Sequence, residues 1–350
     1  MSAKPSTPLQ AALRRIAAGA SLSDEQSASA FNAVMAGEGT AAQLGALLMG
    51  LRVKGETPDE LAGAARALRG AMTVLGTARP RELVDTCGTG GGAITTFNIS
   101  TAAALLAAGA GVRVAKHGNR SYTTKSGSAD VLEALGVAID VPVDRMGEVL
   151  DRAGIIFMFA PTMHPAMRHV GPARREMAIE TLMNLVGPLA NPAGAGRQVI
   201  GVASPGRVEL IAGALQRLGT THSLVVHGAP GMDEISPIGL TTVIELRGKD
   251  LSRWTIDPAQ YGFSAMNAEE LAGGEPSENA ALIERVLAGS GPAAAEAAVL
   301  LNAAGAIYVS GLATTYAAAL DRARVALRKG EGSAALARLR AAAPHGCAGQ

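Results

Sequence analysis

The segment between residues 83 and 115 constrains the fold most, because it reads as strand, glycine-rich turn, helix and strand in succession. Residues 83–85 predict the first strand, residues 101–110 the helix, and residues 112–115 the second strand. Two strands joined through one helix pair in parallel, and a parallel sheet needs helices packed against it. A fold of the α/β class is therefore expected.

Three later apolar runs of strand length extend this pattern: residues 155–159, 199–202 and 223–226. A helical pattern over residues 207–218 separates the last two, as in a further strand, helix and strand unit. An Ala-rich stretch at residues 292–306 predicts a closely packed helix. The expected large domain is a mostly parallel sheet flanked by helices on both faces.

The first part of the chain, residues 8–74, shows helical periodicity without a strand. One helix face carries apolar residues three and four positions apart: Leu44, Leu47, Leu48 and Leu51. Thr40 and Gln43 have the spacing of a capping box, which marks a helix start. We expect a small all-helical domain here, followed by a connector at residues 76–81.

Charge and composition exclude several classes of function. The 350 residues carry 31 basic and 30 acidic side chains, so the net charge of +1 gives no overall attraction to nucleic acid or to a membrane surface. No uninterrupted apolar run reaches about 18 residues, and the N-terminal segment lacks the apolar core of a signal peptide. Two cysteines, Cys87 and Cys347, argue against a disulfide framework. We expect a cytoplasmic protein without a membrane or nucleic-acid partner.

A glycine-rich turn at residues 85–92 follows the first strand, and a short loop leads from it to the helix opened by Asn98. Glycines remove the Cβ atoms that hold a phosphate away, and a helix N-terminus adds N–H donors and positive partial charge. The turn matches neither a Walker loop nor the three-glycine dinucleotide pattern. It predicts a site for another phosphorylated ligand, although many α/β proteins have glycine turns that bind nothing.

The polar segment at residues 116–130 follows a predicted strand at once. It holds three cations, a histidine, an asparagine and several hydroxyl groups, and few apolar residues. This composition favours a loop that lines a site, and the alternative is a solvated polar loop. His117, taken alone, is more often a structural hydrogen-bonding group than a catalyst.

Adjacent carboxylates, Asp233 and Glu234, follow the predicted strand at residues 223–226 and a glycine turn. Carboxylate oxygens bind Mg²⁺ directly or through its waters. Acidic pairs are also common on protein surfaces, so the pair alone leaves both possibilities open. Opposite a diphosphate site, metal binding becomes the favoured interpretation.

Together these segments resemble the anthranilate phosphoribosyltransferase family over almost the whole chain. The matching sequence includes GTGG at 88–91, TFNIST at 96–101, KHGNR at 116–120, KSGSADVLEALG at 125–136, and residues 159–161, 164–167, 187–189 and 233–234. The implied fold is that of class III phosphoribosyltransferases and nucleoside phosphorylases.

This resemblance implies a small helical domain of residues 1–78 with an insertion near residues 172–196. The large α/β domain would then comprise residues 79–171 and 197–350. A homodimer formed through the helical domain is also implied, with the active site in the cleft between the domains.

The resemblance further implies transfer of the 5-phosphoribosyl group from 5-phosphoribosyl 1-diphosphate, the donor, to the amine of anthranilate. The implied substrate contacts are Gly88, Gly91, Gly92, Thr96, Asn98, Ile99, Ser100, Thr101, Lys116, His117, Gly118, Asn119, Arg120, Ser121, Tyr122, Thr123, Thr124, Ser128 and Arg174. The implied ligands of Mg²⁺ are Ser100, Asp233 and Glu234. Arg174 would pair with the carboxylate of anthranilate, and Arg175 is the adjacent alternative.

The implied catalytic residues are Lys116, His117 and Asn119. We expect displacement at ribose C1 through a loose transition state, with Mg²⁺, Lys116 and backbone donors neutralising the leaving diphosphate. His117 would orient substrate rather than act as an obligatory base.

Two positions depart from the family pattern. Gly92-Ala93 stands where an acidic residue commonly follows the paired glycines, and residues 180–184 read ETLMN where RTIFN is usual. Two other functions stay open as alternatives. One is a pyrimidine-nucleoside phosphorylase of the same superfamily, which this chain resembles less well. The other is a non-catalytic relative that binds nucleic acid, which requires a basic stripe with stacking aromatic residues.

Overall fold

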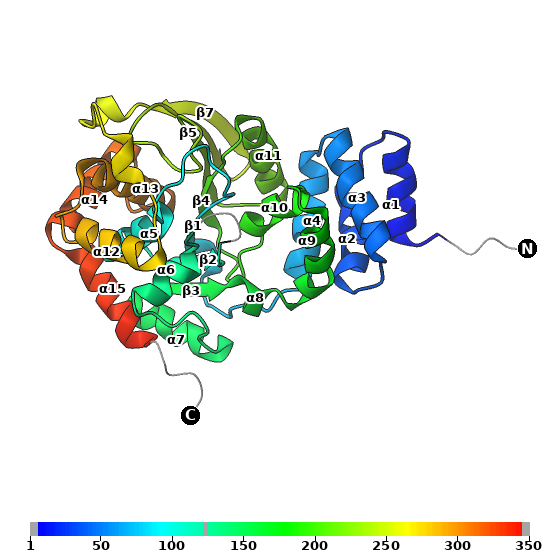
Figure 1. Ribbon diagram of the computed structural model, residues 1–350, viewed down its shortest axis with the longest axis horizontal. Coiled ribbons are helices and arrows are strands. Elements are labelled where there is room, and N and C mark those ends of the chain that lie inside the picture. The colour runs from blue at the N-terminus through cyan, green and yellow to red at the C-terminus, as the bar shows by residue number, and fades with distance from the viewer. Residues whose placement is uncertain (1–5, 122–124, 345–350) are drawn as a thin grey trace, which may run out of the picture. The chain divides into compact units, whose positions relative to one another are not determined.

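The computed structural model describes residues 6–121 and 125–344, and its contacts divide the chain into two compact units (Figure 1). Unit 1 comprises Met1–Thr73, Pro161–Pro192 and Glu209–Gly219. Unit 2 comprises Val74–Ala160, Ala193–Val208 and Thr220–Gln350. These bounds differ from the expected ones by several residues, and they assign one further helix to unit 1.

That further helix is α11 (Val208–Leu218), which the sequence pattern leaves with the large domain. From Glu209 onward it groups with the N-terminal helices. Arg217 forms an ion pair with Asp59, and a Cβ on Gly213 would press on the Pro58 ring. A sequence pattern cannot reveal these contacts, because Arg217 and Asp59, for example, are 158 positions apart.

Unit 1 is helical, as the periodicity predicts. Its other helices are α1 (Pro8–Ala17), α2 (Asp24–Met35), α3 (Ala41–Lys54), α4 (Pro58–Gly70), α8 (Ala160–Met163, from Pro161 on), α9 (Gly171–Met177) and α10 (Leu182–Val186). The Thr40 capping box is confirmed, since the Thr40 hydroxyl accepts the Gln43 N–H at 3.2 Å and the Gln43 side chain accepts the Thr40 N–H at 3.1 Å. The expected leucine face of α3 is buried.

Unit 2 contains one seven-stranded sheet in the order β3-β2-β1-β4-β5-β6-β7. Its strands are β1 (Val84–Gly88), β2 (Val114–Gly118), β3 (Ile155–Phe159), β4 (Arg197–Gly201), β5 (His222–Gly228), β6 (Thr241–Arg247) and β7 (Asp250–Ile256). The first five pair in parallel, and β6 and β7 are antiparallel to their neighbours. The predicted mostly parallel sheet is therefore confirmed.

The strand order changes direction between β1 and β4, because the chain adds β2 and β3 on one side of β1 and β4 and β5 on the other. In open α/β sheets, ligands bind outside the carboxyl ends of the strands at such a point. The register aligns Gly88, the last residue of β1, with Gly201, the last residue of β4. The fold thus places the glycine-rich turn at the expected binding edge.

The helices of unit 2 are α5 (Ile99–Gly109), α6 (Ser128–Ala134), α7 (Val143–Ala153), α12 (Pro276–Leu287), α13 (Ala293–Ser310), α14 (Tyr316–Arg328) and α15 (Glu331–Ala342). Helices α5 and α13 pack on each other and against β1. By length and composition α13 could cross a membrane, but 83% of it is buried inside the protein. It is the core helix that the Ala-rich sequence predicts.

One expectation about the strands is wrong, and one pair of strands is not predicted at all. The polar segment does not begin at residue 116 as a loop, because β2 continues through Lys116 and His117 to Gly118, paired with Phe157, Met158 and Phe159 of β3. The sequence patterns also miss the hairpin of β6 and β7, since most side chains of β7 are exposed and polar. A glycine in the connecting turn, Gly248 with a φ of +60°, is the local feature that suits a hairpin.

Candidate active site at the carboxyl edge of the sheet

Three neighbouring parallel strands each end in a glycine, and the loop that carries Asp233 and Glu234 packs closely against these three strand ends. A Cβ atom on Gly88 of β1 would collide with the Asp233 carboxylate, and one on Gly201 of β4 would collide with the Asp233 carbonyl oxygen. A Cβ on Gly228 of β5 would collide with the Glu234 carbonyl oxygen. The acidic pair therefore lies directly over the ends of β1, β4 and β5.

The carboxylates of Asp233 and Glu234 accept hydrogen bonds from the two elements that the sequence predicts to bind phosphate. Asp233 Oδ2 accepts the N–H of Gly90 in the glycine turn at 2.8 Å. Glu234 Oε1 accepts the N–H of Ser100 in the first turn of α5 at 3.1 Å. The glycine turn, the helix N-terminus and the acidic pair are thus parts of one site.

The environment of the two carboxylates opposes their ionisation. Burial raises the pKa of Asp233. Burial, and then the charge of Asp233, raises the pKa of Glu234 to about 8. A cation close to both groups would favour their charged forms.

The donor set suits Mg²⁺, because Ser100, Asp233 and Glu234 offer oxygen atoms only and the two carboxylates are neighbours. Within the described residues, no group of three His, Cys, Asp or Glu side chains is placed to hold a metal ion by itself. Mg²⁺ commonly completes its coordination with water and substrate phosphates. The residues therefore fit a metal that arrives with a phosphorylated ligand.

Lys116 is a buried strand residue, whereas the sequence predicts that it lies in a loop that lines the site. Its side chain is 3% exposed, and its amine donates to the Thr86 carbonyl at 2.6 Å and to the Ser100 hydroxyl at 3.2 Å. Burial lowers the pKa of Lys116, and the nearby charges of Asp85 and Glu234 act in the opposite direction. Lys116 thus places its amine beside Ser100 from within the sheet.

His117 is also buried, and its backbone N–H donates to Asp85 Oδ1 at 3.2 Å. Asp85 and Thr86, both buried in β1, hold the two β2 residues in place. The sequence motifs did not mark either of them as a functional residue. Their signal is weak, since a polar residue in an apolar strand is the only indication.

The segment after β2 folds back on α6. A Cβ on Gly118 would collide with the Ser128 hydroxyl, which itself donates to the Asn119 carbonyl at 3.3 Å. Arg120 pairs with Asp130 at 2.7 Å and Glu133 at 2.5 Å, and these bonds raise its pKa. The predicted contacts Tyr122, Thr123 and Thr124 lie outside the described residues.

The Ser121 N–H donates to Asp130 Oδ2 at 3.2 Å, so this residue also lies over the start of α6. Gly91 has a φ of +75°, a conformation that glycine adopts without strain. A Cβ atom on Gly92 would lie 3.1 Å from the carbonyl oxygen of Gly231. Both glycines thus lie in the turn that meets the acidic loop.

The start of α5 contributes residues of two kinds. Ile99 and Thr101 have buried side chains, whereas Asn98 and Ser100 are half-buried. Thr96 forms an isolated bridge with Ala272, so a later segment contacts the loop that precedes the helix. Ser100 is therefore the half-buried side chain in the first turn of this helix, whereas the Asn98 side chain bonds to Ser126 and Asn279.

Arg174 lies in unit 1, on α9. Its guanidinium donates to Asn184 Oδ1 at 3.2 Å, and the same oxygen accepts the Thr181 N–H at 3.2 Å. Arg175 and Glu180 are exposed. The structure thus gives Arg174 a defined position within unit 1, which its neighbour Arg175 does not share.

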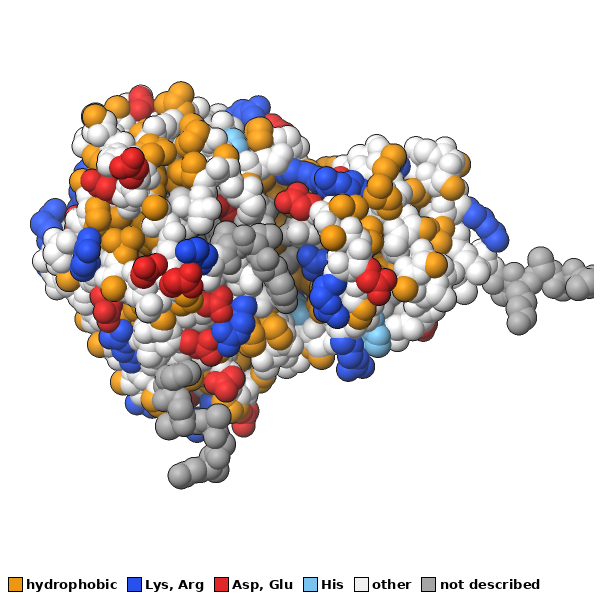
Figure 2. Space-filling model, viewed as in Figure 1, with side chains coloured by type: hydrophobic (Ala, Val, Ile, Leu, Met, Phe, Trp, Pro, Cys, Tyr) orange, Lys and Arg blue, Asp and Glu red, His pale blue; other side chains and the backbone are white. Residues whose placement is uncertain are grey.

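The surface shows mixed charge over unit 2. On the face seen in Figure 2, basic and acidic side chains of its described residues are interspersed rather than gathered in one stripe. The nucleic-acid alternative requires such a stripe. On this face, unit 2 therefore gives no support to that alternative.

Comparison with known proteins identifies the family. Residues 80–333 match the glycosyl transferase family a/b domain, and residues 10–72 match the glycosyl transferase family helical bundle domain. The anthranilate phosphoribosyltransferase of Methanosphaerula palustris is 47% identical over 87% of this chain and 90% of its own length. That of Rubrobacter xylanophilus is 46% identical over 94% of this chain and 96% of its own.

Solved structures agree with the sequence relatives. The crystal structure of anthranilate phosphoribosyltransferase from Thermus thermophilus has a TM-score of 0.89 and 42% identity, covering 95% of this chain and 98% of that one. The Saccharomyces cerevisiae enzyme, in complex with PRPP and Mg, shares the fold with a TM-score of 0.86 at 24% identity, covering 97% of this chain and 98% of that one. With identity near one half over almost its full length, the chain belongs to the anthranilate phosphoribosyltransferase family.

Proposed function

We propose that the carboxyl edge of the sheet in unit 2 is where this transferase binds its donor, 5-phosphoribosyl 1-diphosphate, together with Mg²⁺. The enzyme transfers the 5-phosphoribosyl group to the amine of anthranilate, giving N-(5-phosphoribosyl)anthranilate and diphosphate in tryptophan biosynthesis. The observation that carries the placement is the contact of Asp233 with Gly90 and of Glu234 with Ser100. The diphosphate then lies beside the glycine turn and the α5 N-terminus.

Catalysis in this site relies mainly on position and charge: the amine nitrogen bonds to ribose C1 as the C1–O bond to diphosphate breaks, and the nitrogen then loses one proton to solvent. The amine of anthranilate is already an uncharged nucleophile. Backbone N–H groups of the turn, the Ser100 hydroxyl and the buried charge of Lys116 stabilise negative charge on the departing diphosphate. Mg²⁺, when bound at Asp233 and Glu234, neutralises part of the same charge. We propose that Asn119, which directly follows β2, orients the ribose or the acceptor.

The fluorescence of anthranilate offers a direct test of this function. We expect its emission to fall when the full chain, Mg²⁺ and the donor are mixed, at a rate proportional to enzyme concentration. Mixtures without the donor serve as the control and should keep their emission. Constant emission in the complete mixture, with binding of single-stranded DNA, would favour the nucleic-acid alternative instead.

Arg174 is proposed to bind the carboxylate of anthranilate. For Arg174→Ala we expect the KM for anthranilate to rise about 10-fold to 100-fold, since a charge-assisted hydrogen bond contributes about 1.5–3 kcal/mol. The KM for the donor should change by less than about two-fold, as in the matched control Arg175→Ala. Steady-state kinetics with each substrate varied in turn gives both values. A rise for the donor alone, or an equal effect from Arg175→Ala, would reassign the role.

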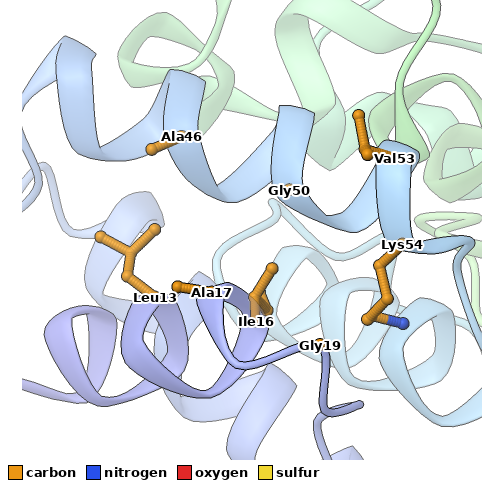
Figure 3. Close-up of a pocket in the computed structure, with 8 residues that line it drawn as sticks. All are labelled: Leu13, Ile16, Ala17, Gly19, Ala46, Gly50, Val53 and Lys54. Atoms are coloured by element: carbon orange, nitrogen blue, oxygen red, sulfur yellow. The ribbon is translucent and has the colours of Figure 1, made fainter.

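We also propose that the protein is cytoplasmic and forms a homodimer through unit 1. A hollow of about 510 Å³ lies between α1 and α3 (Figure 3). Its lining is almost wholly apolar: Leu13, Ile16, Ala17, Gly19, Ala46, Gly50, Val53 and the stem of Lys54. Val53 is 75% exposed and Met49 on the same helix 46%. An apolar surface of this kind favours a partner, and a second copy of the chain is the occupant that the family resemblance implies.

A charge in this hollow should weaken the dimer. For Val53→Asp we expect the dimer dissociation constant to rise about 30-fold or more, because a central interface charge costs about 2 kcal/mol or more. Val325→Asp, on α14 of unit 2, is the matched control for an exposed valine. Sedimentation equilibrium measures both. A monomeric wild type, or a Val53→Asp dimer as tight as the control, would contradict the proposal.

A further inference from the structure

Asn98 begins α5 but does not cap it. Asparagine is among the favoured residues at this position, because its side-chain oxygen accepts a first-turn N–H. Here the Asn98 side chain makes no such bond. Its amide group instead donates to the Ser126 carbonyl at 3.1 Å, and its oxygen accepts the Ser126 hydroxyl at 3.1 Å. The side chain is therefore turned away from the helix N-terminus.

A second asparagine fixes this orientation. Asn279, on α12, donates its side-chain N–H to Asn98 Oδ1 at 2.9 Å. Its own Oδ1 accepts the Gly274 N–H at 2.8 Å. Asn279 is only 3% exposed, so both bonds are shielded from water. An amide suits this position because it supplies a donor and an acceptor at once in a small side chain.

The segment before α12 also contacts the loop that leads to Asn98. The Phe97 N–H donates to the Leu271 carbonyl at 2.9 Å, and the Gly273 N–H donates to the Thr95 carbonyl at 3.2 Å. A Cβ on Gly273 would collide with the Thr96 carbonyl. Residues 271–279 thus lie along this loop and end at Asn98.

Ser126 and Asn98 belong to different strand-end loops, one following β2 and the other following β1. Their side chains meet at a single point, and Asn279 completes the hydrogen bonding there. A substitution of Asn279 would therefore affect the positions of both loops, because Asn98 Oδ1 bonds to Asn279 and to Ser126.

We propose that Asn279 is a positioning residue that joins the two donor-binding loops by holding the Asn98 side chain against Ser126. The inference rests on the proposed donor site. Asn279 does not touch the donor. It keeps the Asn98 side chain away from the α5 N-terminus, so that the helix start is open to the diphosphate. It also holds Ser126, in the loop after β2, at a fixed distance from Asn98. Donor affinity, rather than acceptor affinity, depends on it.

Kinetic constants of the full-length enzyme test the proposal. For Asn279→Leu, which has nearly the same shape but no polar group, we expect the donor KM to rise about ten-fold, since one shielded hydrogen bond is worth about one factor of ten. The anthranilate KM should change by less than about two-fold. Asn267→Ala is the control, because the Asn267 side chain caps a short turn in the same region by accepting the Glu269 N–H. An unchanged donor KM, or an equal rise for both substrates, would overturn the proposal.

A double-mutant cycle separates positioning from general damage to the fold. If Asn279 acts through Asn98, then Asn279→Leu should raise the donor KM by less than about two-fold when Asn98→Ala is already present. Independent effects that multiply in the double variant would contradict the proposal. If Asn279→Leu does not fold, Ser126→Ala is the second test, because it removes the other side-chain hydrogen bond to Asn98 Oδ1. A raised donor KM in Ser126→Ala supports the proposal, and an unchanged donor KM overturns it. A wild type that leaves anthranilate emission constant would refute the proposed function itself, before any variant is compared.

Discussion

The double variant Asp233→Asn with Glu234→Gln is expected to need at least about ten times more Mg²⁺ for half-maximal activity, and its kcat/KM should fall about 100-fold. Amides keep the size of both side chains but remove their negative charge. The hydrogen bonds to Gly90 and Ser100 can still form, because an amide oxygen also accepts. The loss of activity would therefore result from weaker Mg²⁺ binding rather than from a change in the shape of the loop.

Activity measured as a function of Mg²⁺ concentration gives both values. Asp144→Asn with Glu148→Gln makes the same chemical changes on the exposed face of α7 and is the matched control. Its Mg²⁺ dependence should equal that of the wild type. An unchanged Mg²⁺ requirement in the Asp233 and Glu234 variant would remove the acidic pair from the metal site.

Gly201→Ala should be as damaging, although residue 201 carries no chemistry. Its added methyl group would collide with the backbone carbonyl of Asp233, which cannot rotate away as a side chain would. The acidic loop must then move, and displacement of a catalytic group by about 1 Å can cost about 100-fold in rate. Overpacking of this kind also costs about 1–3 kcal/mol of stability.

Gly206→Ala is the matched control, because the methyl group added there would meet no atom within 4 Å beyond its chain neighbours. We expect that variant to keep wild-type activity and stability. Measurements of kcat/KM and of thermal unfolding on both variants separate the two effects. A Gly201→Ala enzyme as active as Gly206→Ala would show that the acidic loop does not need its close approach to β4.

The departure at Gly92-Ala93 has a local explanation. The Ala93 N–H donates to the Gly231 carbonyl at 2.8 Å, and a Cβ on Gly231 would press on Ala93. The glycine turn and the acidic loop thus meet backbone against backbone at this point. The small residues at 92 and 93 suit that contact, whereas the exposed position of Glu180 leaves its replacement of a cation without a structural reason.

Sequence patterns predicted the elements that depend on local order. The strand, turn and helix around residues 84–109 and the Ala-rich helix α13 follow from periodicity, glycine and capping residues. The depth of Lys116 did not follow, because burial depends on β2 lying between β1 and β3. A local pattern contains no information about strand order.

The meeting of Asp233 with Gly90 was likewise implied by resemblance and not by spacing, since 143 positions separate them. Gly201 and Gly228 each read as ordinary strand-end glycines in the sequence. Only the structure shows that these two glycines leave space for the backbone of Asp233 and Glu234. Asn279 is hidden for the same reason, because its partner Asn98 is 181 positions away.

A crystal structure of the enzyme with 5-phosphoribosyl 1-diphosphate and Mg²⁺ tests the central claim most directly. We expect the diphosphate against the backbone of residues 88–92 and the first turn of α5, with the metal ion near Asp233 and Glu234. Density for the diphosphate at any other part of the chain, with this edge of the sheet holding neither ligand nor metal, would contradict the claim.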